Sequence, residues 1–306
     1  MILVLGNTGF LGKRVCKILE EKSLKYQGIS LSKDLDLRDR SKTLSFFLDL
    51  KPRYVLNCAA YVGGIQFGYK HPAELFHNNL HMTLNILEAS SKSNVKRLIN
   101  PISNCAYPSK LTFFKEEDFW EGPLHESVLI YGLARKISWA GSWAYSKQYN
   151  LDVINIILSN MYGPEDHFEE EKSHALGALV MKIFKAKKDN LPYVNIWGSG
   201  KPVREWLYID DGANAMINAM HISSTTDPIN IGVGKGISII ELATIIAKEL
   251  DYKGEFKLDL SKPDGASFKT MDGTKGKEYF NWEPEMDLKK GIKETVKWYT
   301  NNQEKL

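Results

Sequence analysis

Tyr131 and Arg135 form the pair of residues whose types and spacing most clearly suggest chemistry. They lie four positions apart in a run of good helix formers, and positions i and i+4 share one face of a helix, so the two side chains are predicted to point the same way. A cation held beside a phenol favours the phenolate, which suits proton transfer at a carbonyl. Lys136 lies about 100° further round the helix, which makes it a poor substitute for Arg135. Taken alone, the pair also fits an exposed tyrosine on a surface helix.

Ser103, Cys105 and His174 are the other candidates for proton handling. Ser103 and Cys105 follow a predicted strand over residues 95–99, and in extended chain their side chains would point to the same side. Open α/β sheets bind ligands at the carboxyl ends of their strands, so the hydroxyl and the thiol are candidate site residues. Two plainer interpretations stay open, because a free cysteine often serves as a small buried hydrophobe and a lone histidine is more often structural.

The start of the chain has the pattern of a strand, a glycine-rich turn and a helix, over residues 1–5, 6–12 and 13–22. Glycine recurs there as G-x-x-G-x-x-G, which lets the backbone turn tightly and approach a pyrophosphate. The helix N-terminus then supplies free N–H groups and a partial positive charge. This context predicts dinucleotide binding. The predicted cofactor contacts in the turn are Gly6, Thr8, Gly9, Phe10, Leu11 and Gly12.

The end of the second predicted strand, residues 26–30, bears on the choice between NAD and NADP. An acidic residue near this point binds the ribose in NAD-dependent proteins, and none is present here. Ser32 and Lys33 could instead receive a 2′-phosphate, which favours NADP(H) over NAD(H), although a polar loop with a chance lysine is the alternative. Asp36, followed by Leu37, is placed to reach the adenine.

A regular alternation of strands and helices continues to about residue 163. The third predicted strand ends in Ala59 and Ala60, small residues against which a cofactor can lie, and residues 61–70 are predicted to form an active-site loop. Further elements are predicted over residues 71–91 (helix), 95–99 (strand), 131–149 (helix) and 151–159 (strand). This order predicts an α/β fold with a Rossmann-type, doubly wound parallel sheet.

The bulk composition excludes several classes of protein. The chain has 306 residues, 43% of them hydrophobic, and a net charge of +3, which is too small to indicate a nucleic-acid surface. Its three cysteines are scattered, which indicates a reducing compartment. The sequence shows neither a signal-peptide pattern nor an apolar run long enough for a membrane span. These features predict a cytoplasmic protein with no nucleic-acid or membrane partner, and no metal site is predicted.

Taken together, the motifs resemble the extended short-chain dehydrogenase/reductase superfamily, that is, the NAD-dependent epimerases and dehydratases. Within it the chain is most similar to the GDP-L-fucose synthase family, the GDP-4-keto-6-deoxymannose epimerase/reductases. Besides the glycine turn and Tyr131 with its cation, the likeness is carried by Asn57-Cys58-Ala59-Ala60, Val62-Gly63-Gly64, Ser103-x-Cys105-x-Tyr107-Pro108, Asn160-Met161-Tyr162-Gly163-Pro164, Ser173-His174, Trp197-Gly198-Ser199-Gly200, Arg204-Glu205 and Ser261-Lys262-Pro263-Asp264-Gly265.

The resemblance implies a set of catalytic roles. Tyr131 would protonate the C4 oxygen of a GDP-linked 4-keto sugar while NADPH delivers hydride, and Ser103 would hydrogen-bond the same oxygen. Cys105 and His174 would act as base and acid for epimerisation at C3 and C5. Arg135 stands where the family has a lysine that contacts the nicotinamide ribose. It keeps the positive charge but is bulkier and planar.

The resemblance also implies the binding residues, the domains and the oligomer. The implied substrate contacts are Val62, Gly63, Asn160, His174, Leu179, Trp197, Arg204 and Lys262, with Arg204 and Lys262 on the pyrophosphate. Residues 1–163 plus about 204–222 would form the dinucleotide-binding domain. Residues from about 164–203 plus 223–306 would form a smaller α+β nucleotide-sugar-binding domain. A homodimer would form through the helices at about 71–91 and 131–149.

Several functions stay open at this point. The first is an NADPH-dependent reductase that also epimerises C3 and C5, acting on a GDP-4-keto-6-deoxy-hexose or a related GDP-4-keto-heptose. The second is a reductase-only or epimerase-only member of the family. The third, suggested by Arg135, is a catalytically weak dinucleotide-binding subunit.

Overall fold

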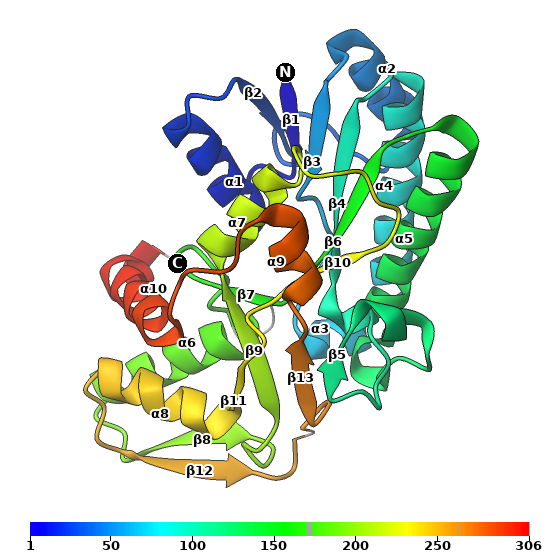
Figure 1. The fold of residues 1–306 in the computed structure, drawn as a ribbon. Helices are drawn as coiled ribbons and strands as arrows, with labels where there is room; N and C mark the ends of the chain where they lie inside the picture. The colour runs from blue at the N-terminus through cyan, green and yellow to red at the C-terminus, as the bar shows by residue number, and fades with distance from the viewer. Residues whose placement is uncertain (170–172, 263, 306) are drawn as a thin grey trace.

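The computed structural model describes residues 1–169, 173–262 and 264–305, so Pro263 of the predicted Ser261–Gly265 motif lies outside the described residues. Six parallel strands form its largest sheet (Figure 1). Their order across the sheet is β10 (Ile229–Ile231), β6 (Val153–Leu158), β4 (Arg97–Ser103), β3 (Tyr54–Asn57), β1 (Ile2–Leu5) and β2 (Tyr26–Ile29). The parallel pairing throughout confirms the predicted α/β class and Rossmann-type sheet.

Helices cover both faces of this sheet (Figure 1). The first strand shows why, because Ile2 and Val4 belong to one hydrophobic core while Leu3 and Leu5 belong to another. On one face lie α1 (Phe10–Glu21) and α7 (Ile209–Asn218). On the other lie α2 (Arg40–Leu50), α4 (Pro72–Lys92) and α5 (Leu129–Tyr149), with α4 packed between its two neighbours.

A second, five-stranded sheet branches from the first directly after β6. Strand β7 (Asn160–Tyr162) pairs with β9 (Val203–Tyr208), and β9 lies between β11 (Gly236–Ser238) and β13 (Phe268–Met271). Strand β5 (Phe113–Phe114) pairs with β13 at the edge. Beyond this sheet, β8 (Tyr193–Trp197) and β12 (Glu255–Asp259) form a parallel pair. The remaining helices are α3 (Ile65–Lys70), α6 (Ala175–Lys188), α8 (Ile239–Glu249), α9 (Thr274–Phe280) and α10 (Leu288–Asn302).

Short 3₁₀ turns occupy much of the segment between β4 and α5. They are η1 (Asn104–Ala106), η2 (Glu116–Trp120) and η3 (Glu126–Val128), and a further one, η4 (Gln303–Lys305), follows α10. The turn η1 corrects one prediction, because Cys105 does not continue the extended chain of Ser103. The Ser103 hydroxyl accepts a hydrogen bond from the Cys105 N–H at 3.2 Å and so caps the turn.

Two other local predictions also need correction. The predicted loop over residues 61–70 contains helix α3, which begins after Gly64. The motif that begins at Asn160, which follows the predicted strand over residues 151–159, contributes a further strand, β7, because it pairs with β9. Both differences come from pairing or packing with segments far away in the chain, which local patterns do not contain.

The division into two domains stays a prediction. Strand β10, from the stretch assigned to the second domain, lies at the edge of the six-stranded sheet, whereas β9, from the first, lies in the five-stranded sheet. Within the described part of the chain, none of the helices is both long and apolar enough to cross a bilayer.

Asp166, which follows β7, carries a buried carboxylate that is only half satisfied. Its side chain is 5% exposed, and one oxygen accepts the His167 N–H at 2.7 Å. The other oxygen, Oδ2, has no hydrogen-bond partner among the described residues. Burial raises the pKa of Asp166 to about 7 from an ordinary 3.8. The folded state therefore binds the Asp166 proton more tightly than the unfolded chain does. The protonated carboxyl contributes to the free energy of unfolding below its ordinary pKa, and this contribution is lost as the pH rises through the pKa of the folded state.

We expect Asp166→Asn to remove the loss of folding stability that ionisation of Asp166 causes at high pH, because an amide cannot ionise. At pH 8 the variant should be more stable than the unaltered protein, by at most on the order of 4 kcal/mol, and the difference should close at pH 4. Urea unfolding at pH 4, 6 and 8 measures this. An equal loss of stability in the variant at all three pH values would contradict the interpretation.

Candidate active site

The glycine turn after β1 forms a cradle with space for a dinucleotide. Gly6 has φ +74°, and a Cβ there would lie 2.8 Å from the Cα of Ala59. A Cβ on Gly12 would lie 2.1 Å from the Gly6 carbonyl oxygen. Gly9 is the N-cap of α1 and has no side chain to occupy the first N–H groups of that helix, which therefore remain for an anion. These residues fit the pyrophosphate of a nicotinamide dinucleotide.

The other residues predicted in this turn divide between the cradle and the core. Thr8 and Phe10 are half-buried, whereas Leu11 is part of the hydrophobic core. Ala59 and Ala60 directly follow β3, and the Ala59 N–H donates to the Asn57 side-chain oxygen at 3.2 Å. Small side chains therefore form the wall opposite Gly6.

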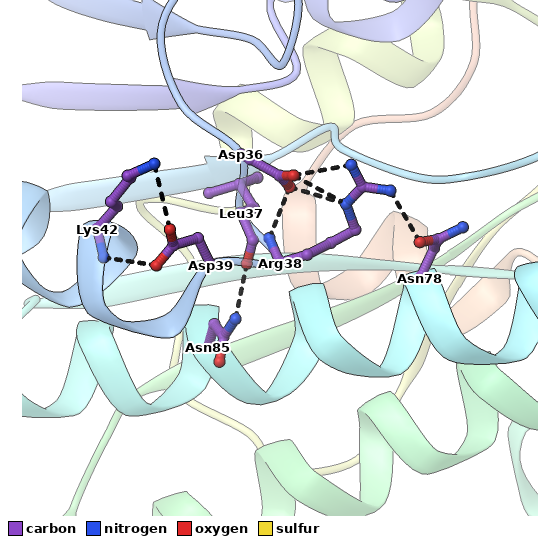
Figure 2. A network of polar contacts seen from close by, with 7 residues as sticks. All are labelled: Asp36, Leu37, Arg38, Asp39, Lys42, Asn78 and Asn85. Atoms are coloured by element: carbon purple, nitrogen blue, oxygen red, sulfur yellow. Dashed lines mark hydrogen bonds and ion pairs between the residues drawn. The ribbon is translucent and has the colours of Figure 1, made fainter.

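The predicted adenine-side residues lie in the loop between β2 and α2 (Figure 2). The Arg38 guanidinium donates two hydrogen bonds to the Asp36 carboxylate, from Nε at 2.8 Å and from a terminal nitrogen at 2.7 Å. Its other terminal nitrogen donates to the side-chain oxygen of Asn78 on α4 at 2.9 Å. This guanidinium lowers the pKa of Asp36. Asp36 is therefore ionised and anchored to the protein, which keeps the loop in one shape.

Leu37 and the two residues predicted for the 2′-phosphate lie on either side of this network. The Leu37 side chain is buried in the hydrophobic core. Its backbone carbonyl accepts a hydrogen bond from the Asn85 side-chain amide at 2.9 Å, which ties the loop to α4 (Figure 2). Ser32 and Lys33 are exposed just beyond β2. Their exposure leaves a hydroxyl and an ammonium open to a phosphate.

Helix α5 packs against the turn that carries Cys105, one residue after Tyr131. The turn η1 packs on α5, and Gly132 is the point of closest approach. A Cβ on Gly132 would lie 2.4 Å from the Cys105 carbonyl oxygen and 3.0 Å from the Leu124 side chain. Only glycine allows the first turn of α5 to lie this close to the Cys105 carbonyl.

Arg135 and Lys136, adjacent in sequence, serve different neighbours. The Arg135 guanidinium carbon lies 4.9 Å from the centre of the Tyr131 ring, as the i, i+4 spacing predicts. Arg135 is 5% exposed, and its Nε has no hydrogen-bond partner among the described residues. Lys136 instead donates to the carbonyl of Phe119 and lies 4.9 and 4.5 Å from the Phe119 and Trp120 rings. It fastens η2 to α5, so it does not substitute for Arg135 beside Tyr131.

Lys269 is a site residue that the sequence did not single out. Strand register pairs it with Arg204, so the two cations stand side by side on one face of the second sheet. The Lys269 Nζ lies 4.0 Å from the Cys105 Sγ. Burial lowers the pKa of Arg204, while the charges of Cys105 and Asp264 oppose this shift. A lone lysine in the short strand Phe268–Met271 was the only available signal for Lys269.

Glu205 holds these strands in place. It is completely buried, and its two carboxylate oxygens accept the N–H groups of Val233 at 2.5 Å and Met271 at 2.8 Å. Burial raises its pKa to about 7. Asn160 is predicted to bind substrate. Its side-chain N–H donates a hydrogen bond to the Glu205 backbone carbonyl at 2.9 Å, so the amide nitrogen of Asn160 stabilises the pairing with β9.

His174 is the N-cap of α6. Its side chain is exposed, yet surrounding protein removes enough water to lower its pKa, and the charges of His167 and Lys269 add to the effect. The imidazole is neutral at pH 7.

The remaining substrate candidates divide into an open group and a buried one. Trp197 is 36% exposed. The centre of its ring lies 4.1 Å from the Lys182 Nζ and 5.5 Å from the Lys262 Nζ. Lys182 on α6 is a second residue that the sequence did not single out. The Leu179 side chain is buried in the hydrophobic core, so it anchors α6 to that core.

Val62 and Gly63 lie before α3. Val62 is 45% exposed, and a Cβ on Gly63 would lie 2.5 Å from the Phe67 ring. Gly63 thus permits the turn into this helix. Among the described residues, no group of three or more His, Cys, Asp or Glu side chains is placed to hold a metal ion.

Comparison with known proteins gives matches over nearly the whole chain. The profile of the NAD dependent epimerase/dehydratase family matches residues 2–232. The chain is 35% identical over 303 residues to the probable GDP-L-fucose synthase 1 of Oryza sativa subsp. japonica, covering 98% of this chain and 92% of that protein.

Two solved structures are also similar. A GDP-6-OMe-4-keto-L-xylo-heptose reductase from C. jejuni superposes with a TM-score of 0.91 at 27% identity, covering 98% of this chain and 97% of that one. A GDP-L-fucose synthetase from Naegleria fowleri bound to NADP gives a TM-score of 0.88 at 32% identity, covering 99% of this chain and 93% of that one.

Proposed function

The chain belongs to the NAD dependent epimerase/dehydratase family, and from this premise we propose that it is an NADPH-dependent reductase of a GDP-linked 4-keto sugar that also epimerises the carbons beside the ketone. The predicted resemblance to the GDP-L-fucose synthases is confirmed by relatives that match nearly end to end. One observation carries the proposal. The Tyr131–Arg135 pair and the Ser103–Cys105 turn, which lie on different elements, meet at Gly132.

The reduction needs a proton for the C4 oxygen. The dinucleotide, when bound, supplies the hydride. Tyr131 donates its phenolic proton to the oxygen, and the Ser103 hydroxyl holds the same oxygen in place. Arg135 keeps a positive charge against the Tyr131 ring, which stabilises the phenolate left behind. Since Arg135 is enclosed and its Nε makes no hydrogen bond to the described residues, its terminal nitrogens are the groups available to the nicotinamide ribose.

Epimerisation needs a base and an acid near the ketone. A ketone acidifies the C–H bonds on its neighbouring carbons, and Cys105 as a thiolate can remove such a proton. The Lys269 ammonium, 4.0 Å from the sulfur, provides a counter-charge for that thiolate. His174 lies near the same ammonium and exchanges protons on the other side. The contact between Cys105 and Lys269 favours the bifunctional enzyme over a reductase-only protein.

The GDP end of the substrate has its own group of cations. Arg204, Lys262 and Lys182 are suited to phosphate oxygens. Trp197 offers a partly exposed ring between two of these lysines. On the cofactor side, exposed Ser32 and Lys33 support NADP(H) over NAD(H), in line with the NADP-bound relative.

Tyr131→Phe should lower the rate of NADPH oxidation with a GDP-4-keto-sugar by about 10²–10⁴-fold, because the proton donor is lost. NADPH affinity should change little, since the ring and Arg135 remain. Stopped-flow fluorescence measures binding and absorbance measures turnover. Undiminished turnover would refute the role of Tyr131. If the unaltered protein binds NADPH but turns over no GDP-4-keto-sugar, the catalytically weak subunit is the correct reading.

Cys105→Ser should stop solvent deuterium exchange at C3 and C5, because a serine hydroxyl is a far weaker base than a thiolate. Reduction of a substrate that already has the product configuration should be retained. Mass spectrometry of the product formed in D₂O reports both steps at once. Exchange that persists in the variant would point to another base, and no exchange in the unaltered protein would mean reduction only.

We also propose a homodimer through α4 and α5. These helices pack together, and their outer surface exposes Phe76 (39%) and Leu84 (55%) on α4 and Leu133 (37%) and Trp143 (46%) on α5. Large apolar side chains that are exposed on two packed helices indicate an association surface. A two-fold axis beside this surface would pair each helix with its copy.

Leu84→Glu should shift the protein towards monomer, because a carboxylate would be buried in the apolar contact. Light scattering after gel filtration measures the mass. Leu260→Glu is the matched control, since Leu260 is 74% exposed and lies away from α4 and α5. A monomeric unaltered protein, or equal masses for both variants, would reject this dimer.

A further inference from the structure

His125 is a polar residue beside the site to which neither the motifs nor the proposed reaction gives a role. It lies just before η3, in the segment that runs from Cys105 to Tyr131. The Ser127 N–H donates to its Nδ1 at 3.2 Å, and the Ser127 hydroxyl lies 2.8 Å from the same nitrogen. Because Nδ1 accepts, the neutral ring carries its proton on Nε2. The histidine is therefore fixed in one tautomer, with a hydrogen-bond donor at its outer end.

The neighbours of His125 in sequence place its segment beside the turn that carries Cys105. Its neighbour Leu124 packs at the Cβ position of Gly132, the same point that the Cys105 carbonyl approaches to 2.4 Å. On the other side, η3 packs against α3, and the Ser127 carbonyl lies 3.9 Å from the Cβ position of Gly68. His125 thus lies between the Cys105 turn and the helix that follows the predicted substrate contacts Val62 and Gly63.

Two cations of the site act on the ring. After burial, the charges of Lys269 and Arg204 are the main causes that lower the pKa of His125, against a smaller opposing effect of Glu126. These are the side-by-side cations of β13 and β9, and Lys269 touches Cys105. The ring is accordingly neutral at pH 7, so it acts as a donor without adding a third charge.

We propose that His125 donates a hydrogen bond from Nε2 to the sugar ring of the substrate and so positions that ring. This inference rests on the proposed function, in which Arg204 holds the pyrophosphate and Cys105 faces a carbon beside the ketone. The pyranose must then span the space between Arg204 and Cys105. The segment that carries His125 packs beside the Cys105 turn at Gly132, and the charges of Lys269 and Arg204 both act on its ring. In this proposal its fixed Nε2–H therefore selects a sugar oxygen that Arg204 and Lys269 do not reach.

Calorimetry with two stable probes, GDP and GDP-mannose, tests this on the NADP⁺-saturated protein. The ratio of the two dissociation constants isolates what the sugar contributes. His125→Ala should weaken GDP-mannose binding by about tenfold, the usual effect of losing one hydrogen bond, and leave GDP unchanged. His125→Gln, which keeps an N–H donor, should recover most of the loss. His77→Ala is the matched control, because His77 is an exposed histidine on α4, outside the site.

The outcomes separate the two proposals. If the unaltered protein binds both probes but the ratio is the same in His125→Ala, the inference about His125 is wrong and the proposed function stands. If the unaltered protein binds neither probe, both are overturned. NMR of ¹³C-labelled histidine guards against misfolding of the variant, because the His125 resonance in the unaltered protein should shift with GDP-mannose and not with GDP. An unshifted resonance would equally reject the proposal.

Discussion

The buried carboxylate of Glu205 is the contact on which the geometry of the site depends. It accepts one N–H from Val233 and one from Met271, which joins β9 to the loop after β10 and to β13. Each of these N–H groups, left unpaired in the interior, would cost about 1–3 kcal/mol. Arg204 precedes Glu205, and Lys269 lies two residues before Met271. The hydrogen bonds that satisfy this carboxylate therefore also set the two cations side by side and bring Lys269 to Cys105.

Helix α5 makes a second link, because its first turns make three separate contacts. Gly132 lets it touch the Cys105 turn, Arg135 turns back to the Tyr131 ring, and Lys136 reaches the aromatic segment at Phe119. Burial of two adjacent cations is costly. Two aromatic rings and a carbonyl stabilise the Lys136 ammonium, whereas the Arg135 Nε has no hydrogen-bond partner in the part of the chain that the structure describes. Arg135 is thus held against the Tyr131 ring, and under the proposed function its terminal nitrogens bind the ligand.

The cofactor half of the site was largely predictable, because its signals are local. A strand, a glycine turn and a helix follow one another within the first 21 residues, and the i, i+4 rule placed Arg135 on Tyr131. The substrate half was less so. Lys269 and Lys182 carry no motif of their own, and their importance comes from contacts with Cys105 and Trp197, which lie far from them in the chain or on another element. Sequence spacing says nothing about such neighbours.

What the sequence by itself determined was the alternation of elements, the dinucleotide turn, the family and the types of the reacting side chains. These follow from periodicity, glycine geometry and rare strings, all of which are written along the chain. Only the tertiary structure decided that Cys105 sits in a turn capped by Ser103 and that Asp36 is anchored by Arg38. It also set Lys269 beside the Cys105 thiol and fixed the His125 ring through Ser127. These contacts depend on strand register and on the burial of charged groups. Both are set only when segments that are distant in the sequence pack together in the folded interior.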